Sequence, residues 1–460
     1  MMRICLALLL FSVATQSARA QEGLLEIYER ALINDPSIRE AEANFLATAE
    51  VKPQARSGLL PALRLSGSTS DNHSERDAPQ DPVSGLPDPV IAGFESDSQS
   101  TNFSVSLNQT VFDWAAFLSL KQADKTIARA ETDLASIEQD LMIRVATAYF
   151  NVLAAEDLLA ADIAAREALR QQLDQTNRRF EVGLIAITNV QEAQAGYDQA
   201  VAAVIGSERT LATAQESLRE IINDYVIDLE SPIDDLPLLR PDPDDVDAWV
   251  EAAQEQNLAL ISSRIEAEIA QDDIRIARSS RFPTLSLSAS ASDNTGESQQ
   301  QNNLVGGGAV VGPLVESGGQ SDGVSLSLNV PLFTGGANRS RIQQSVYRSR
   351  ATLEAVERVA RQTERLTRDA YLGVVSQISQ IEAQARVLES SRTALLATQA
   401  GFEVGQRTGV DVVNAQNSVR RAETTYAGAR YDYLLNLLRL KQAAGSLSPD
   451  DLAEIDAWLE

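Results

Sequence analysis

The chain has 460 residues, of which 65 are acidic and 39 basic, so its formal net charge is −26. A charge of this sign argues against binding to nucleic acid, which requires a basic surface. The only cysteine is Cys5, so the sequence offers neither a disulfide framework nor a structural thiolate metal site.

The first twenty residues (1–20) predict a secretory signal peptide. Arg3 supplies a positive start, an apolar run follows from Ile4 to Phe11, and Ala18-Arg19-Ala20 matches an A-x-A cleavage signal. Cleavage after Ala20 also removes Cys5. No later segment has 18 consecutive apolar residues, so a transmembrane helix is not expected. The mature protein is therefore secreted or periplasmic, or it crosses a membrane as β-strands.

Residues 21–222 predict a first repeat that begins with a helix. Apolar and alanine positions recur at helical spacing from Leu24 to Ser57, with bends expected at the prolines. The hydrophobic period then changes to two, which predicts strands at about 62–70 and 102–112. The polar segment between them, Asp71 to Thr101, is predicted as a long exposed loop.

A very long helix is predicted after the second strand, from about Trp114 to Val182, because this segment contains no proline and is rich in helix-forming residues. At 1.5 Å per residue it would be roughly 100 Å long. The chain then turns at about 183–188 and continues as a helix to about Ile222. The shorter helices of the repeat would match the long one if they stacked end to end beside it.

Residues 223–245 contain several prolines and predict an extended acidic linker, or equatorial region. A second repeat, 246–445, then follows in the same order. Its predicted parts are a helix to about Ser280, strands at about 284–292 and 323–333 around a loop at 293–322, a long helix to about Val404, a turn at about 405–410 and a helix to Ala444. The C-terminal tail, 446–460, contains one more short helical pattern near Ser448.

An offset of 222 positions relates the two halves. It carries Asp35 onto Asn257 and Tyr149 onto Tyr371. It also carries Phe180-Glu181-Val182-Gly183 onto Phe402-Glu403-Val404-Gly405. The chain is therefore predicted to be an internal tandem duplication.

Each predicted strand has about 9–11 residues, the length that a tilted strand needs to cross a bilayer. One face is apolar and the other is rich in hydroxyl groups, although half-buried strands of a soluble sandwich alternate in the same way. Four strands cannot close a barrel, and open sheet edges are forbidden in lipid. Membrane strands would therefore be shared between chains, with twelve strands in a trimer or eight in a dimer.

Several short motifs occur in a definite order. They are Leu24-Leu25-Glu26-Ile27-Tyr28 with Asn34-Asp35-Pro36, Leu59-Leu60-Pro61 before the first strand, the two Val-Gly turns, and Ala429-Arg430-Tyr431-Asp432-Tyr433 with Ala444-Gly445 near the end. Through these motifs the chain resembles the TolC family of outer-membrane efflux proteins over its whole mature length.

The resemblance implies a mostly α-helical fold with a membrane β-barrel portion. Three chains would contribute four strands each to a twelve-stranded barrel, continued by a long periplasmic α-helical barrel. The implied function is the outer-membrane exit duct of a tripartite efflux pump or type I secretion system, without catalytic activity or cofactor. The implied partners are other copies of the chain in a homotrimer, a periplasmic adaptor, an inner-membrane transporter and outer-membrane lipid, but no nucleic acid.

The resemblance also implies a gate at the inner end of the duct. Well-known members carry two acidic rings there, and the matching positions are Asp411 and the uncharged Asn414. Losing one ring should weaken block by cations, because fewer carboxylates surround the axis. The alternative interpretation is that the residues of this region only form turns and helix caps, with Thr188 and Asp411 as the caps.

A polar latch accompanies the rings in those relatives. The matching positions are Arg407, Phe402, Thr188 and Asn189, next to the turn glycines Gly183 and Gly405. Phe402 lacks the hydroxyl group, and Asn189 lacks the charge, of the residues at these positions in the relatives. The resemblance therefore implies a closed state held by fewer polar contacts.

An enzyme is not expected, because the only histidine, His73, falls in a polar segment and no phosphate loop or nucleophile elbow occurs. Asp242–Asp247 faintly resembles a calcium loop but lacks its central glycine and terminal glutamate, so no metal site is predicted. The remaining alternative is a soluble periplasmic coiled-coil adaptor, which would have long helices but no four-strand alternation.

Overall fold

The computed structural model describes residues 21–77, 91–226, 228–233, 235–304 and 306–460. The predicted signal peptide (1–20) lies outside these residues. The chain divides into two compact units. The first contains the residues up to Phe45 together with Glu131–Ser263 and Ala355–Glu460, and the second contains Leu46–Ala130 and Arg264–Glu354.

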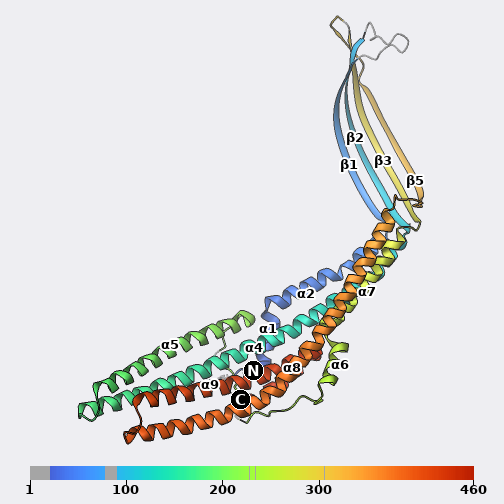
Figure 1. Ribbon diagram of the computed structural model, residues 1–460. Helices are drawn as coiled ribbons and strands as arrows, with labels where there is room; N and C mark the ends of the chain where they lie inside the picture. The colour runs from blue at the N-terminus through green and yellow to red at the C-terminus, as the bar shows by residue number, and fades with distance from the viewer. Residues whose placement is uncertain (1–20, 78–90, 227, 234, 305) are drawn as a thin grey trace, which may run out of the picture. The chain divides into compact units, whose positions relative to one another are not determined.

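The second unit contains one antiparallel sheet (Figure 1). Its long strands, in order across the sheet, are β1 (Ala62–Asp77), β2 (Ile91–Phe112), β3 (Thr284–Leu304) and β5 (Val315–Asn329). A short strand, β4 (Ala309–Val311), pairs with the end of β3. Within the described residues, β1 pairs only with β2 and β5 only with β3, so each has one edge without a partner.

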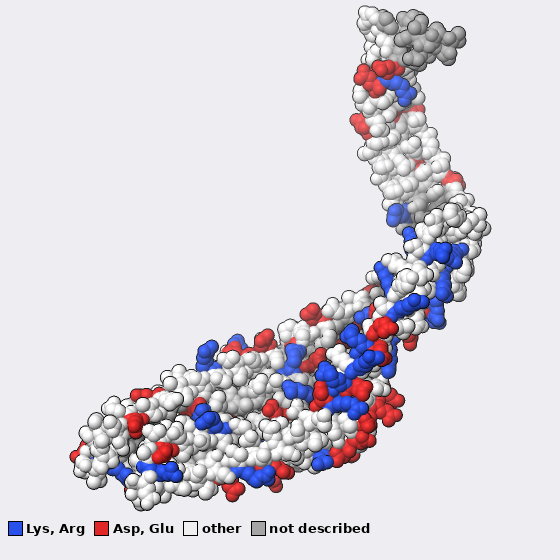
Figure 2. All heavy atoms as spheres, in the orientation of Figure 1, with Lys and Arg blue, Asp and Glu red and all other residues white. Residues whose placement is uncertain are grey.

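One face of the sheet carries an exposed apolar band. The register places Leu63 beside Leu107, Leu107 beside Ala289, and Ala289 beside Val324, so the band crosses all four long strands. Leu63 and Val324 are 72% and 75% exposed. In Figure 2, uncharged atoms cover most of the visible surface of the sheet. Contiguous exposed apolar surface of this kind marks contact with a membrane or a partner.

The opposite face of the sheet is lined with serine. The hydroxyl oxygens of Ser70 and Ser100 are 2.8 Å apart and share a hydrogen bond. Ser292 and Ser321 form the equivalent pair in the second repeat, also at 2.8 Å, and Ser288 and Ser325 form another at 2.8 Å. The two faces therefore differ as the sequence predicts, with apolar side chains on one and hydroxyl groups on the other.

The strands are longer than the sequence predicts, and the predicted loop at 293–322 is wrong over most of its length. The predicted loop at 71–101 is wrong at 71–77 and 91–101, and its remaining part, 78–90, lies outside the described residues. β1 continues to Asp77, β2 begins at Ile91, β3 continues to Leu304 and β5 begins at Val315. The apolar alternation stops in these segments, but strand pairing depends on backbone hydrogen bonds, which continue in register. β5 ends at Asn329, before the predicted end, because Pro331 has no N–H for the ladder.

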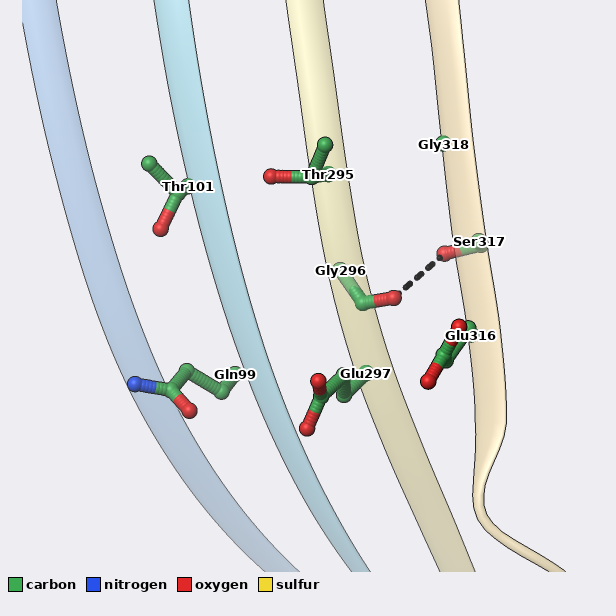
Figure 3. A pocket seen from close by; sticks show the side chains of 8 residues that line it. All are labelled: Gln99, Thr101, Thr295, Gly296, Glu297, Glu316, Ser317 and Gly318. Carbon is green, nitrogen blue, oxygen red and sulfur yellow. Dashed lines mark hydrogen bonds between the residues drawn. The ribbon is translucent and has the colours of Figure 1, made fainter.

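Beyond the apolar band, the same face of the sheet becomes polar and acidic. Glu297 of β3 lies directly between Gln99 of β2 and Glu316 of β5. Together with Thr101 and Thr295 these residues line a shallow hollow (Figure 3). Two carboxylates directly opposite each other repel, and they can remain charged only where water solvates them. The apolar band therefore ends before this level of the strands.

The first predicted helix is divided into α1 (Leu24–Asn34), α2 (Pro36–Ala49) and α3 (Val51–Ser57). Pro36 breaks it as predicted, whereas the second break falls at Glu50. Pro53 lies in the first turn of α3, where its missing N–H is not needed by the helix.

The equivalent helix of the second repeat is predicted to be continuous, but it is divided into α6 (Val246–Gln256) and α7 (Leu258–Ser279). Asn257 lies at the break. Its side-chain oxygen accepts a hydrogen bond from the Leu260 N–H at 3.1 Å, and its side-chain nitrogen donates to the Ala443 carbonyl at 3.0 Å. Asp35, its repeat equivalent, accepts from the Ser37 N–H at 2.6 Å. The same position therefore caps the following helix in both repeats.

The predicted long helices are confirmed: α4 (Trp114–Glu181) has 68 residues and α8 (Ala337–Glu403) has 67. The helices that follow the turns, α5 (Ile187–Ile222) and α9 (Gly409–Ala444), have 36 residues each. Among the described residues, no helix combines the length and the apolar character that crossing a membrane would require.

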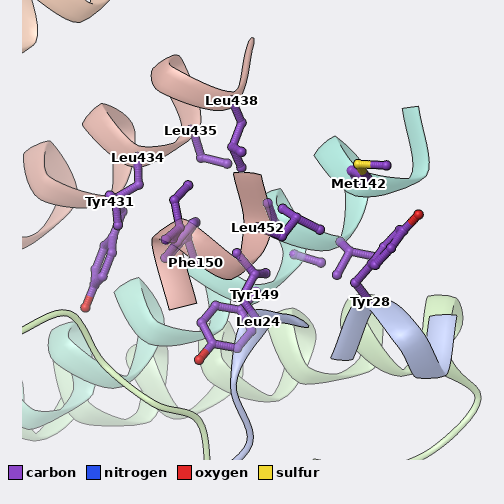
Figure 4. Packing of buried hydrophobic residues seen from close by; sticks show 14 of the residues in the cluster. Leu24, Tyr28, Met142, Tyr149, Phe150, Tyr431, Leu434, Leu435, Leu438 and Leu452 are labelled. Carbon is purple, nitrogen blue, oxygen red and sulfur yellow. The ribbon is translucent and has the colours of Figure 1, made fainter. Parts of the chain in front are cut away.

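The first unit is built around one apolar core (Figure 4). Tyr149 and Phe150 of α4 and Leu434 of α9 are at most 1% exposed. Leu24 of α1 and Leu452 of α10 (Pro449–Asp456) complete the same cluster. α10 is the short helix predicted in the tail, and it brings the C-terminal end of the chain onto this core.

The segment predicted as an extended linker, 223–245, packs against this core. Leu229 is 4% exposed and forms a parallel bridge with Glu22, and Pro232 pairs with Leu459. The Tyr149 hydroxyl donates to the Glu230 carbonyl at 2.7 Å. Buried Leu229 and these backbone contacts therefore hold the segment on the core.

Candidate functional site at the two helix turns

The two predicted turns have the same backbone structure and lie at one end of the first unit (Figure 1). Gly183 and Gly405 have φ angles of 74° and 77°, which only glycine adopts without strain. The Gly405 N–H donates to the Phe402 carbonyl at 3.1 Å, and the next N–H, of Gln406, donates to Gly401 at 2.8 Å. Gly183 and its successor repeat this pattern. Both long helices thus end in a Schellman motif.

The second turn restarts the helix with a capping box. The Thr408 side chain accepts from the Asp411 N–H at 3.2 Å, and the Thr408 N–H donates to the Asp411 carboxylate at 2.8 Å. Thr408 is therefore the cap, and the prediction that Asp411 caps this helix is wrong. Asp411 is instead the third helical residue, which completes the box.

These contacts affect the charge of Asp411. The Thr408 N–H and hydroxyl both donate to its carboxylate, and Arg407 adds a positive charge nearby. Together they lower the pKa of Asp411 below its ordinary value. The carboxylate predicted to form an acidic ring is therefore held ionised at the start of α9, where the helix dipole also favours negative charge.

The first turn has a weaker cap. Helix α5 starts after Ala186, which has no side chain able to accept a hydrogen bond, so the prediction that Thr188 is the cap is wrong. The Thr188 hydroxyl instead donates to the Asn189 side-chain oxygen at 3.4 Å. The two residues predicted as one half of the latch thus contact each other.

The second half of the latch is arranged differently from the prediction. Arg407 is exposed and lies over Gly401, where an added Cβ would be 2.8 Å from its Cγ. In the described part of the chain, Arg407 forms no ion pair or side-chain hydrogen bond with Thr188 or Asn189. Asn414 is exposed on the first turns of α9, and its carbonyl accepts a hydrogen bond from the Ser418 hydroxyl at 2.9 Å.

Arg179, which the sequence analysis missed, connects the two turns. Its guanidinium carbon lies 4.9 Å from the centre of the Phe402 ring, and Phe402 is only 6% exposed. It also donates to the Phe402 carbonyl at 3.2 Å and to the Glu403 carbonyl at 3.4 Å. A basic residue in the last turn of α4 was visible in the sequence, but its partner on α8 was not.

The helices after the turns also lie against each other. A Cβ added to Gly196 of α5 would lie 3.0 Å from Cγ2 of Val413 on α9. The absence of a side chain at Gly196 therefore allows the two helices to approach closely. Both turns and the first parts of α5 and α9 form one connected end of the unit. Among the described residues, no cluster of histidine, aspartate or glutamate could hold a metal ion.

Comparison with known proteins gives consistent results. The sequence model of a family described as "Outer membrane efflux protein" matches residues 27–224 and 249–446, one match for each half of the predicted duplication. The chain is 33% identical to outer membrane protein TolC of Escherichia coli over 437 residues, which cover 95% of this chain and 84% of the relative. It is 28% identical to the alkaline protease secretion protein AprF of Pseudomonas aeruginosa, covering 95% and 87%.

The fold also has known counterparts. The crystal structure of the Campylobacter jejuni outer membrane channel CmeC matches with a TM-score of 0.71 and 15% sequence identity. The match covers 95% of this chain and 90% of that chain. At this identity the likeness concerns the fold alone, which confirms long helices with a sheet portion. The two matches of the family model confirm the tandem repeat.

Proposed function

Because the chain belongs to the outer membrane efflux protein family, we propose that it forms a homotrimeric exit duct gated at the two helix turns. The family is one of transport proteins, and the chain is an outer-membrane channel protein of efflux and type I secretion. We expect no catalytic activity.

The unpartnered edges of β1 and β5 support the assembly. Each edge leaves a row of backbone N–H and C=O groups unpaired, which a membrane does not tolerate. Pairing β5 of one chain with β1 of the next satisfies both edges and places the serine face inward. Three chains give twelve strands, enough for a water-filled interior, whereas two give the eight strands of the smallest barrels.

The turns support the position of the gate. Half-buried Asp411 and exposed Asn414 lie on the first turns of α9, at the end where both turns meet. In a trimer, three Asp411 carboxylates near the axis would attract cations and repel one another. Because the capping box holds the Asp411 side chain against its own helix, the carboxylate would keep its place at the start of α9 when the chains move apart and the ring widens. The single ring and the exposed Arg407 agree with a closed state held by few polar contacts.

A periplasmic adaptor and an inner-membrane transporter complete the proposed pathway. In this proposal the transporter supplies the energy for export and the chain supplies the passage. AprF is named as a protease secretion protein, and TolC as an outer membrane protein. Both relatives align over almost the whole chain, so export of protein and export of small molecules are both compatible with this duct.

The position of the gate can be tested by restoring the second acidic ring. We expect Asn414→Asp to add three carboxylates near the trimer axis and to strengthen block of single-channel current by divalent cations about tenfold. The measurement is conductance of the purified trimer in planar bilayers with increasing magnesium on the helical side. Asn417→Asp, with the same charge change one turn further along α9, is the matched control.

Equal block in both variants would show only a general charge effect and would contradict a constriction at Asn414. The trimer itself is tested separately, by the mass of the detergent-extracted protein. A monomer or dimer of stable mass would contradict the shared sheet independently of the gate.

A further inference from the structure

A groove opens on the second unit between α3 and the first turns of α4. It has a volume of about 650 Å³. Its lining combines cationic and apolar side chains: Lys52, Pro53 and Arg56 of α3, Leu60 before β1, and Phe117, Leu120, Lys121 and Asp124 of α4. None of these residues belongs to the turns or to the core already described.

The groove lies where two strands of the sheet join their helices. β1 begins two residues after Leu60, and α4 begins directly beyond β2. Gln109 lies on the face of β2 that carries the apolar band, since it is two residues from Leu107. Its side chain donates to the Leu59 carbonyl at 2.8 Å, next to Leu60. The groove therefore continues the exposed apolar band of the sheet.

The apolar part of the groove is open to its surroundings. Leu60 and Phe117 are 50% and 45% exposed. Trp114, 44% exposed, lies beside Phe117 with ring centres 6.3 Å apart. Tryptophan and other aromatic residues at the end of an apolar band are typical of the boundary between lipid tails and headgroups.

The cations of the groove outnumber its anions. Lys52 pairs with Asp124 at 2.6 Å. In the described part of the chain, Arg56 and Lys121 form no ion pair, although the protein as a whole carries a charge of −26. Two free cations beside exposed apolar side chains match a ligand that has both a negative head and an apolar tail.

We propose that this groove binds an anionic phospholipid of the membrane leaflet on the helical side of the sheet. Arg56 and Lys121 bind the headgroup phosphate, and an acyl chain lies against Leu60 and Phe117. Arginine and lysine are the side chains that bind phosphate best, by paired hydrogen bonds and by point charge respectively. The site would anchor the sheet at a defined depth, whatever substance the duct carries.

The proposal predicts selective lipid retention. Detergent-purified protein is mixed with equal amounts of phosphatidylglycerol and phosphatidylcholine, and bound lipid is counted by native mass spectrometry. We expect wild type to retain phosphatidylglycerol. The double substitution Arg56→Gln and Lys121→Gln should weaken its binding about 25-fold, since each surface cation contributes about 1 kcal/mol, or about fivefold.

The duplication offers a matched control. Arg278 is the repeat equivalent of Arg56, and Arg341 lies on the first turns of α8. Substituting both by glutamine removes the same charge from outside the groove. Equal loss of phosphatidylglycerol in the two double variants would show general surface attraction and would overturn the proposal.

Two further outcomes would overturn it. Glycerol phosphate has the headgroup charge without acyl chains, and competition by it as strong as by the whole lipid would mean a free phosphate site. A change in the oligomeric mass of the Arg56 and Lys121 variant, with lipid retention unchanged, would mean that a neighbouring copy of the chain occupies the groove. Neither result depends on where the duct is gated.

Discussion

At the scale of single residues, the contact between the turns comes from Arg179. It stacks on the Phe402 ring and donates to two carbonyl groups at the C-terminus of α8. The Phe402 carbonyl also accepts from the Gly405 N–H, and a positive charge beside these last carbonyls of the helix is favoured by the helix dipole. Phe402 lacks a hydroxyl group, so its ring face takes the place of a polar contact.

We expect Arg179→Ala to loosen the second turn without unfolding the unit. The variant loses a cation–π contact and two hydrogen bonds from a charged donor, and about 1.5 kcal/mol of local stability corresponds to about tenfold faster amide exchange. Hydrogen exchange of the peptide that contains Val404 to Arg407 measures this directly. The exposed neighbour Arg178 provides the control, through Arg178→Ala.

Arg179→Lys tests whether the positive charge of Arg179 or the planar shape of its guanidinium holds the second turn. Lysine retains the positive charge at the helix end, but it cannot place a planar guanidinium on the ring and reach two carbonyls. If amide exchange in Arg179→Lys is as fast as in Arg179→Ala, the planar guanidinium and not the charge holds the turn. Unchanged exchange in all three variants would show that Arg179 does not hold the turn.

At the scale of elements, the capping box of α9 should respond to acid. Hydrogen bonds from Thr408 lower the pKa of Asp411, so its folded value lies below its unfolded value. The stabilisation is therefore complete above the unfolded pKa, near 4, and is lost as the pH falls through the lower folded value. We expect the first turn of α9 to exchange its amides faster in that range, after correction for the intrinsic rate at each pH.

Two substitutions distinguish titration of Asp411 in the capping box from other effects of acid on the protein. Asp411→Asn cannot titrate, so its exchange should not change further with pH in this range. Thr408→Ala removes the hydroxyl that accepts from the Asp411 N–H and donates to its carboxylate, so exchange should be faster than in wild type at every pH, although the Thr408 backbone N–H remains as a donor. A pH response that persisted in Asp411→Asn would have to come from another group, and would contradict this explanation.

The sequence predicts the elements better than their ends. Both long helices and the lengths of α5 and α9 follow from uninterrupted helical patterns and from the glycines that end them. The break at Asn257 was missed because its partner, the Ala443 carbonyl, is distant in sequence. Arg179 was missed for the same reason. Strand length was underestimated because a polar strand pairs through its backbone and has no apolar period to recognise.

At the scale of the whole molecule, the duplication predicts how chains pair. Within the chain, Leu65 of β1 faces Val105 of β2, and Leu287 of β3 faces Leu326 of β5. A shift of 222 residues relates β1 to β3, and a shift of 221 relates β2 to β5. The pairing of β2 with β3 should therefore have an equivalent between β5 of one chain and β1 of the next.

The register between β5 of one chain and β1 of the next follows from the pairing of β2 with β3. Ser104 of β2 faces Ser292 of β3. The same shifts carry Ser104 to Ser325 and Ser292 to Ser70. We therefore expect Ser325 of one chain to face Ser70 of the next, on the serine face. Ser70 already bonds Ser100, and Ser325 bonds Ser288, so this contact would continue hydrogen-bonded serines from chain to chain.

Cysteine substitution tests this register, and removal of Cys5 with the predicted signal peptide would leave no native cysteine to interfere. Ser70→Cys with Ser325→Cys should form disulfides between chains, because directly opposite Cβ atoms lie about 4.5–5.5 Å apart. Pairing Ser325→Cys with Ser68→Cys or Asn72→Cys shifts the contact by two residues on the same face and should give much less product. Crosslinking should link three chains into a covalent trimer on a non-reducing denaturing gel. Product that stops at two chains would contradict the trimer, and strongest crosslinking by a shifted pair would contradict the register.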